Sequence, residues 1–141
     1  MSLYYADTSA VIRLLAEESH SSAFAAFYDA HADAEWVSSA LLRIEVTRAT
    51  LRARPALVPD ARDLLLAFSY VAMDDEIVEA AMNEPDRGLR SLDAIHLATA
   101  RLLGEDLDAI VSYDERLLAA AEDAGLPTLS PREKSQPRLT S

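Results

Sequence analysis

Residues 3–15 read LYYADTSAVIRLL, and this stretch joins a short apolar run to a helical pattern at Asp7. The run before Asp7 is apolar and aromatic without polar alternation, which is typical of a strand buried on both faces. After Asp7, apolar residues recur at helical spacing at Val11, Leu14 and Leu15. A buried strand that passes directly into a helix is the first half of a β-α unit.

Short apolar runs and helical patterns keep alternating through the rest of the chain. Further strands are expected at residues 36–37, 69–73, 109–112 and 126–129. Helices are expected at residues 8–17, 20–32, from Ser38 or Ser39 to 54, 60–68, from Asp74 or Asp75 to 83, 91–103 and 114–124. Repeated β-α units favour an α/β protein, so we predict a three-layer α/β/α sandwich around a mostly parallel sheet of about five short strands.

Composition indicates a single globular domain. Of 141 residues, 50% are apolar and 26% are charged, which suffices for one hydrophobic core. We expect that domain over residues 1–130 and a flexible tail over residues 131–141. The absence of cysteine excludes disulfides, thiol catalysis and zinc sites built on thiolates. With no apolar run long enough for a membrane span and no secretory signal after Met1, the expected location is the cytoplasm and no membrane partner is expected.

Acidic residues outnumber basic ones, 24 against 13, for a formal net charge of −11. Binding nucleic acid would therefore need a cation in the site or a local group of arginines. Lys134 is the only lysine, which argues against a phosphotransfer receiver domain, because that domain needs a lysine late in its sheet. Ser9 stands where a haloacid-dehalogenase-type phosphatase needs a second Asp, and three scattered glycines cannot form a nucleotide-binding loop.

Two carboxylates directly follow predicted strands. Asp7 ends the first strand and Asp114 follows the run at residues 109–112. In an open parallel sheet, ligands bind outside the carboxyl ends of the strands, so both residues are placed at the expected functional edge. Each also has a plainer interpretation, because Asp is a favoured N-cap and either residue could simply begin the next helix.

Two more carboxylates fall on helix faces that should be buried. Glu45 shares a helix face with Leu42 and Ala49. Asp93 shares a face with Leu97 and Ala100, unless it caps the helix in place of Ser91. A buried carboxylate needs a cation, a hydrogen-bond network or a raised pKa. If all four acids converge, their hard oxygen ligands suit Mg²⁺ or Mn²⁺, which would also reconcile the negative charge with a phosphodiester substrate.

Four segments in order carry a resemblance to a known family. They read YADTSA at residues 5–10, SSALLRIEV at residues 38–46, LDAIHLATA at residues 92–100 and VSYDERL at residues 111–117. Together they resemble the PIN-domain ribonucleases, and within these the VapC toxins of toxin-antitoxin pairs. The resemblance covers residues 3–131, although Ser112 stands where the family often has threonine.

The resemblance implies a PIN fold and a Mg²⁺- or Mn²⁺-dependent endoribonuclease that cleaves a structured cellular RNA of the tRNA or rRNA class. It also implies a cognate VapB-like antitoxin and a homodimer. Carried over by position, the catalytic acids are Asp7, Glu45, Asp93 and Asp114, with Asp7 and Asp93 as metal ligands. Ser9 and Ser112 match hydroxyl positions that orient carboxylates or water.

Several residues keep two interpretations. His96 is either a packed core histidine or a catalytic neighbour of Asp93. The arginines at 43, 48, 52 and 54 either contact RNA phosphate or form a solvated face. Phe24, Phe27, Tyr28 and Trp36 either fill the core or offer a surface to a partner. The alternative to a nuclease is a PIN-like module that keeps its acids for structural reasons and acts through protein binding.

Overall fold

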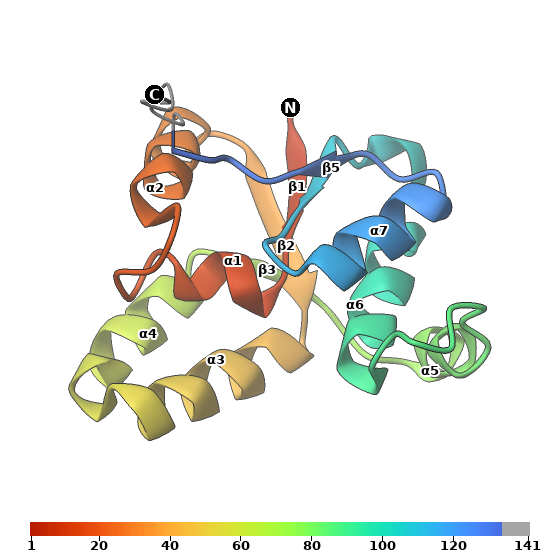
Figure 1. Cartoon of the computed structure of the whole chain (residues 1–141), viewed down its shortest axis with the longest axis horizontal. Coiled ribbons are helices and arrows are strands. Elements are labelled where there is room, and N and C mark those ends of the chain that lie inside the picture. Colours follow the sequence, from red (N-terminus) through yellow and green to blue (C-terminus); the bar gives the residue numbers. More distant parts are fainter. Residues whose placement is uncertain (134–141) are drawn as a thin grey trace, which may run out of the picture.

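The computed structural model describes residues 1–133 and contains one sheet of five parallel strands. The strands are β1 (Leu3–Ala6), β2 (Glu35–Ser39), β3 (Ser69–Val71), β4 (Ala109–Val111) and β5 (Thr128–Leu129), in the order β3-β2-β1-β4-β5 (Figure 1). Tyr5 pairs with Val37 on one side and with Ile110 on the other. The predicted parallel sheet is confirmed, and β1 lies at its centre.

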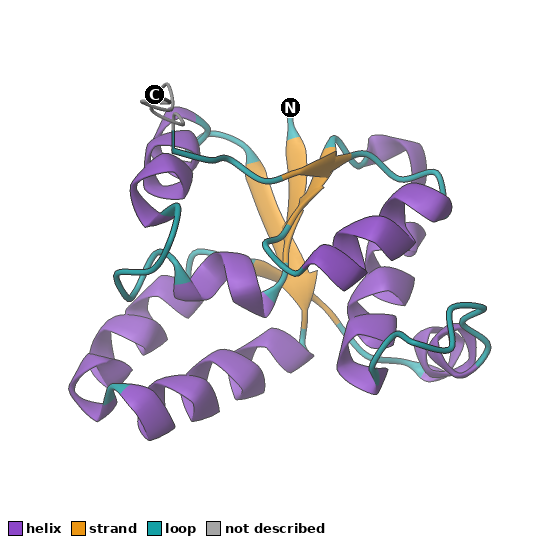
Figure 2. Ribbon diagram, in the orientation of Figure 1, coloured by secondary structure: helices purple, strands orange, loops and turns teal. Residues whose placement is uncertain are grey.

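Helices cover both faces of the sheet, as Figure 2 shows. They are α1 (Thr8–Ile12), α2 (Ser21–Ala30), α3 (Leu41–Ala53), α4 (Val58–Leu65), α5 (Asp75–Met82), α6 (Ser91–Leu102) and α7 (Glu115–Asp123), with short 3-10 turns η1 (Pro55–Leu57) and η2 (Gly104–Asp106). Helices α1 to α4 pack on one face and α6 and α7 on the other. This arrangement is the expected three-layer α/β/α sandwich.

Alternating residues of β1 divide the core in two. Ala6 belongs to the cluster that α1 to α4 bury, while Tyr5 belongs to the cluster under α6 and α7. Phe24 and Trp36 are buried in the first cluster, with Phe27 and Tyr28 packed against them. The aromatic residues therefore serve the core rather than a partner surface.

The first helix is shorter than its pattern predicts. It ends at Ile12 instead of residue 17, and the chain then turns so that His20 adopts a left-handed backbone with φ of 66°. Side chains hold this turn: Arg13 donates to the carbonyls of Ser9 and Ser19 at 2.7 and 2.9 Å, and the Ser21 hydroxyl donates to the Ala16 carbonyl at 3.0 Å. Periodicity cannot reveal such side-chain bonds, so the prediction was wrong there.

Other boundaries also shift. Helix α4 begins at Val58, before the predicted residue 60, because Pro59 favours the first helical turn, and it ends at Leu65 rather than 68. Ser38 and Ser39 lie inside β2 rather than at a helix cap, although the Ser39 hydroxyl still accepts from the Leu41 N–H at 3.1 Å. Asp74 caps α5 as expected and accepts from the Ile77 N–H at 3.0 Å.

The end of the described chain lies against the domain. The Tyr113 hydroxyl donates to the Pro131 carbonyl, and the Glu133 N–H donates to His20 Nδ1 at 3.1 Å. The predicted tail continues past residue 133, and that part, with Lys134, lies outside the described residues. The domain boundary at residue 130 stays a prediction. Across residues 1–133, no helix is long and apolar enough to cross a membrane.

Candidate active site

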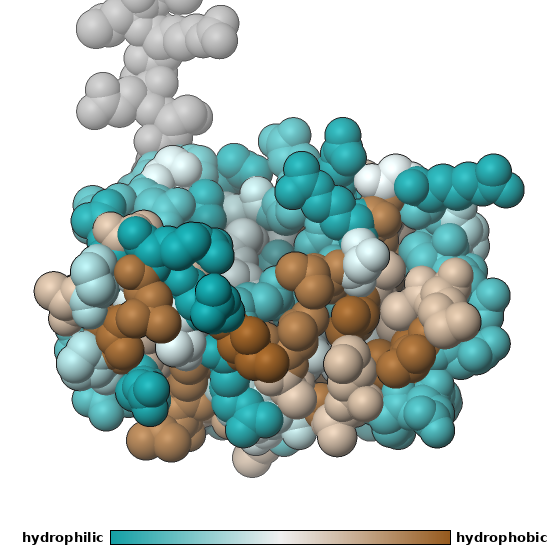
Figure 3. Space-filling view, turned by 90° about the horizontal axis from the view of Figure 1, so that it is seen from below, coloured by the Kyte–Doolittle hydropathy of each residue, from teal (hydrophilic) through white to brown (hydrophobic). Residues whose placement is uncertain are grey.

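All four predicted carboxylates line one cavity at the carboxyl ends of the strands. The cavity measures about 310 Å³, and its walls come from the ends of β1 and β4 and the first turns of α1, α3 and α6. The strands of Figure 1 run downward, so the site lies on the lower face, which Figure 3 views directly. Its lining residues are Asp7, Thr8, Ser9, Glu45, Arg90, Ser91, Leu92, Asp93, His96 and Asp114.

Asp7 is the most constrained of the acids. It caps α1, because its Oδ1 accepts from the Ala10 N–H at 3.1 Å. The interpretation of Asp7 as an N-cap is therefore also correct. Oδ1 accepts from the Ser9 hydroxyl and Oδ2 from the Ser112 hydroxyl, both at 2.7 Å. Burial raises the pKa of Asp7, while the charge of His96 and the two serine hydrogen bonds oppose that rise. The result is a buried carboxyl with both oxygens held in fixed directions.

The two serines are themselves held by the segment that follows β4. The Tyr113 N–H donates to Ser9 Oγ at 2.8 Å, and the Asp114 N–H donates to Ser112 Oγ at 3.0 Å. Ser9 and Ser112 also contact each other at 3.3 Å. The segment after β4 thus fixes the hydroxyls that orient Asp7, from 105 residues away in the sequence in the case of Ser112.

Glu45 belongs to a buried hydrogen-bond chain that the sequence did not predict. Its Oε1 accepts from the Thr8 hydroxyl at 2.9 Å and from His96 Nε2 at 2.7 Å. On the far side of the ring, His96 Nδ1 contacts the Tyr5 hydroxyl at 2.6 Å, and that hydroxyl accepts from the Ser39 N–H at 3.2 Å. This order of partners gives every member of the chain a donor or acceptor.

His96 therefore does more than pack in the core, because it takes part in this hydrogen-bond chain, but its ring is not accessible to a substrate. Its side chain is 2% exposed. Burial lowers its pKa, but the hydrogen bond to Glu45 and the charges of Asp7, Glu45 and Asp93 outweigh burial and raise the pKa overall. The raised pKa favours the protonated form of His96, which lies beneath the acids. Tyr5 was the available signal, because a tyrosine in a fully buried strand needs a partner for its hydroxyl.

Asp93 and Asp114 complete the wall of the cavity. Helix α6 begins after Arg90, so Asp93 lies within the first turn and does not cap the helix. Burial, and then the charges of Asp114 and Asp7, raise the pKa of Asp93 to about 6. Asp114 caps α7 through Oδ1, which accepts from the Arg116 and Leu117 N–H groups at 2.9 and 3.2 Å. Glu115 is exposed and does not line the cavity, which favours Asp114 for the fourth acidic position.

The donor chemistry of the cavity fits a divalent ion that keeps much of its water. Within the described residues, no three acidic or imidazole side chains stand close enough to enclose a metal. The acids instead surround an open space, and the charges of Asp114, Asp7 and Glu45 add to burial in raising the pKa of Asp93, as like charges without a counter-ion do. Mg²⁺ is commonly held by one or two carboxylates, with waters and phosphate oxygens as its other ligands. The site suits that mode rather than a closed cage.

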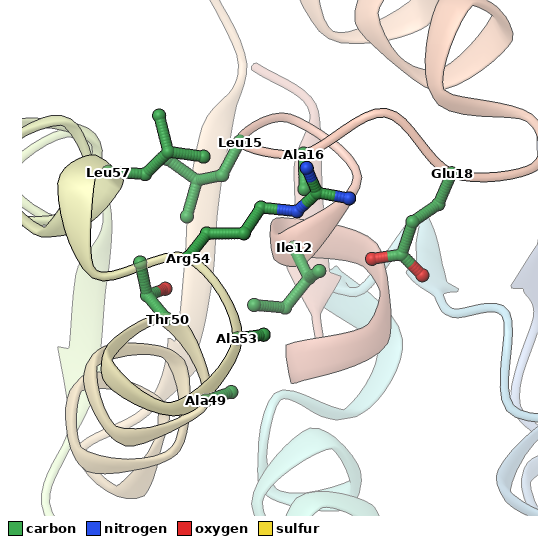
Figure 4. Close-up of a pocket in the computed structure, with 9 residues that line it drawn as sticks. All are labelled: Ile12, Leu15, Ala16, Glu18, Ala49, Thr50, Ala53, Arg54 and Leu57. Carbon is green, nitrogen blue, oxygen red and sulfur yellow. The ribbon is translucent and has the colours of Figure 1, made fainter.

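The arginines on α3 do not reach this cavity. Arg43 stacks over the Tyr70 ring at 4.6 Å, and Arg48 and Arg52 are exposed. Arg54 lines a separate apolar cavity of about 190 Å³ between α1, α3 and η1, where it and Glu18 reach toward the opening over Ile12 (Figure 4). None of the predicted site residues lines that second cavity. The four predicted carboxylates all line the other cavity.

Comparison with known proteins identifies related chains. The PIN domain model matches residues 4–123. Ribonuclease VapC35 of Mycobacterium tuberculosis is 37% identical over 92% of this chain and 97% of its own length. Ribonuclease VapC46 of the same organism is 35% identical over 93% of this chain and 99% of its own length.

Solved structures share the fold. A toxin-antitoxin complex from Klebsiella pneumoniae superimposes with a TM-score of 0.66 at 20% identity, covering 94% of this chain and 99% of the other. VapBC2 from Rickettsia felis, bound to a DNA fragment from its promoter, superimposes with a TM-score of 0.67 at 12% identity, covering 91% and 98%. At these identities the likeness concerns the fold.

Proposed function

Because this chain belongs to the PIN-domain family and is similar to VapC ribonucleases, we propose that it is a metal-dependent endoribonuclease and the toxin of a toxin-antitoxin pair. The observation that carries the proposal is the cavity in which Asp7, Glu45, Asp93 and Asp114 meet. An acidic cavity is a poor place for RNA unless cations neutralise it, so the donor set supports metal chemistry on a phosphodiester. We further propose a structured RNA of the tRNA or rRNA class as substrate.

The proposed mechanism assigns a separate task to each acid. Asp7 and Asp93 would hold Mg²⁺ or Mn²⁺, which when bound supplies charge stabilisation on the phosphate and lowers the pKa of water. Ser9 and Ser112 keep both oxygens of Asp7 in fixed directions. Glu45, held by His96 and Thr8, and Asp114 would orient the attacking water and accept its proton. Attack by water on phosphorus with the 3′-oxygen as the leaving group would give 5′-phosphate and 3′-hydroxyl ends.

Metal binding is tested by thermal unfolding with and without Mn²⁺ or Mg²⁺, since this needs no knowledge of the RNA. At a free metal concentration about 100 times its Kd, the wild-type chain should gain about 2.7 kcal/mol. Asp7→Asn and Asp93→Asn should lose that gain, whereas the exposed neighbour Glu115→Gln should keep it. Equal responses from all four proteins would favour the protein-binding module over the nuclease.

The same experiment has a pH dependence. The pKa of Asp93 is raised to about 6 in the folded chain, so the stability that its protonated form contributes is lost as pH rises through about 6. Metal needs the ionised form, so the gain from Mn²⁺ should shrink as pH falls below about 6.

Two protein partners are proposed together with the ribonuclease function. The similarity to VapBC complexes supports an antitoxin, which would place a basic side chain in the acidic cavity. Figure 3 shows a broad apolar area on the lower face, and the exposed apolar side chains of Ile44, Leu92 and Met73 support a homodimer. Sedimentation of the chain alone should give twice 15.4 kDa, and Ile44→Asp should reduce it. Added antitoxin should abolish the stabilisation by Mn²⁺. A wild-type chain that sediments as a monomer would contradict the homodimer. A complex of this chain with its antitoxin that still binds Mn²⁺ would contradict the placement of a basic side chain in the acidic cavity.

A further inference from the structure

Arg90 is the one strongly basic side chain at the carboxylate cavity. Among residues 1–133 it is the only arginine or lysine that lines this cavity, alongside four carboxylates. An RNA phosphate that approaches the acids meets repulsion, and a divalent ion at Asp7 and Asp93 would offset only part of it. A fixed cation at the rim would supply further attraction.

The segment that carries Arg90 is built to hold one shape. The Gly88 N–H donates to Asp86 Oδ1 at 2.9 Å, and the Leu89 N–H donates to the Asp86 carbonyl at 3.1 Å. Arg116 then donates from Nη1 to the Gly88 carbonyl at 3.1 Å. Because Arg116 lies in the first turn of α7, just after Asp114, this bond ties the loop to the wall of the cavity.

Other arginines near the site have protein partners, whereas the Arg90 side chain has none among residues 1–133. Arg13 lies over the Tyr113 ring at 4.3 Å, Arg43 over Tyr70, and Arg116 on the Gly88 carbonyl. In the described part of the chain, the only ion pair joins His96 to Glu45, and no side-chain hydrogen bond of Arg90 is formed. Arg90 is exposed. Its guanidinium therefore remains free for a ligand from solution.

We propose that Arg90 binds a backbone phosphate of the RNA beside the cleaved bond and so positions the strand over the acids. The inference rests on the proposed ribonuclease function. The planar guanidinium presents paired donors that match two phosphate oxygens. Such a contact sets the register of the strand without reading its sequence.

The test measures binding of bulk tRNA, and separately of rRNA, in Mg²⁺ to chains that carry Asp114→Asn, which slows cleavage while asparagine still caps α7. Adding Arg90→Gln should weaken binding about tenfold. It should also reduce the slope of log K against log salt concentration by about 0.7 to 1. Arg87→Gln is the matched control, because Arg87 is exposed on the same loop but does not line the cavity. Arg90→Lys should restore the slope, since it keeps the charge.

The outcomes of this test distinguish the role of Arg90 from the proposed ribonuclease function on which it rests. An unchanged slope in Arg90→Gln, or an equal change in Arg87→Gln, would overturn the assignment of Arg90 while leaving the ribonuclease intact. A parent chain that binds neither tRNA nor rRNA in Mg²⁺ would overturn the proposed function and this inference with it. Equal melting temperatures of parent and Arg90→Gln are expected, because the Arg90 side chain has no described protein hydrogen bond, and they exclude unfolding as the cause.

Discussion

Asp7→Asn is expected to reduce RNA cleavage by about a thousandfold, because losing metal-borne charge stabilisation of several kcal/mol costs a factor of ten for each 1.36 kcal/mol. The fold should survive, since asparagine is as good an N-cap as aspartate and still accepts from the Ala10 N–H. Single-turnover cleavage of bulk cellular RNA with saturating Mg²⁺ measures the effect.

Glu115→Gln provides the comparison for Asp7→Asn, because it removes an acidic charge beside Asp114 without touching the cavity. It should cleave at close to the wild-type rate. Mapping the ends of the products adds an independent criterion: a 2′,3′-cyclic phosphate would show attack by the ribose hydroxyl and would rule out metal-activated water as the nucleophile.

The largest loss of stability is expected from His96→Leu. The leucine leaves the Tyr5 hydroxyl, which is 0% exposed, without its ring partner and leaves Glu45 without its counter-charge. Breaking a buried ion pair by removing one member costs about 3 kcal/mol or more. The corresponding drop in Tm is roughly 10 °C for a chain of this size.

A double-mutant cycle separates the ion pair from simple packing. Because replacing both members of a buried pair with apolar groups is often tolerated, His96→Leu with Glu45→Leu should recover part of the stability that His96→Leu loses alone. Tyr5→Phe, which removes only the hydroxyl, should cost about 1 to 2 kcal/mol. Additive losses in the cycle, measured by urea unfolding, would mean that His96 and Glu45 do not stabilise each other.

Much of the fold and the placement of the acids could be predicted from the sequence. Both depend on the repeated alternation of apolar strand runs and amphipathic helix patterns. Asp7 and Asp114 end predicted parallel strands, so the topology brings them to one edge. Glu45 and Asp93 stand out because a carboxylate within an apolar helix stripe needs a reason to be there. All four do line the same cavity, while their catalytic roles stay predictions.

What the sequence missed depends on single side-chain contacts between distant segments. Nothing in the spacing of Tyr5, Thr8 and His96 shows that they form one chain of hydrogen bonds to Glu45. The early end of α1 likewise depends on bonds from Arg13 to two carbonyls. Arg90 escaped notice because the sequence shows only an arginine in a loop, and its position at the cavity requires the folded loop.

The bond from Ser112 to Asp7, across 105 residues, has a consequence for the proposed activity during synthesis of the chain. An emerging polypeptide that ends before β4 has Asp7 and Glu45 but lacks Ser112 and Asp114. On the proposed mechanism, the emerging chain is therefore an incomplete catalyst for most of translation. It would become able to cleave RNA only once β4 and the residues that follow it have been made.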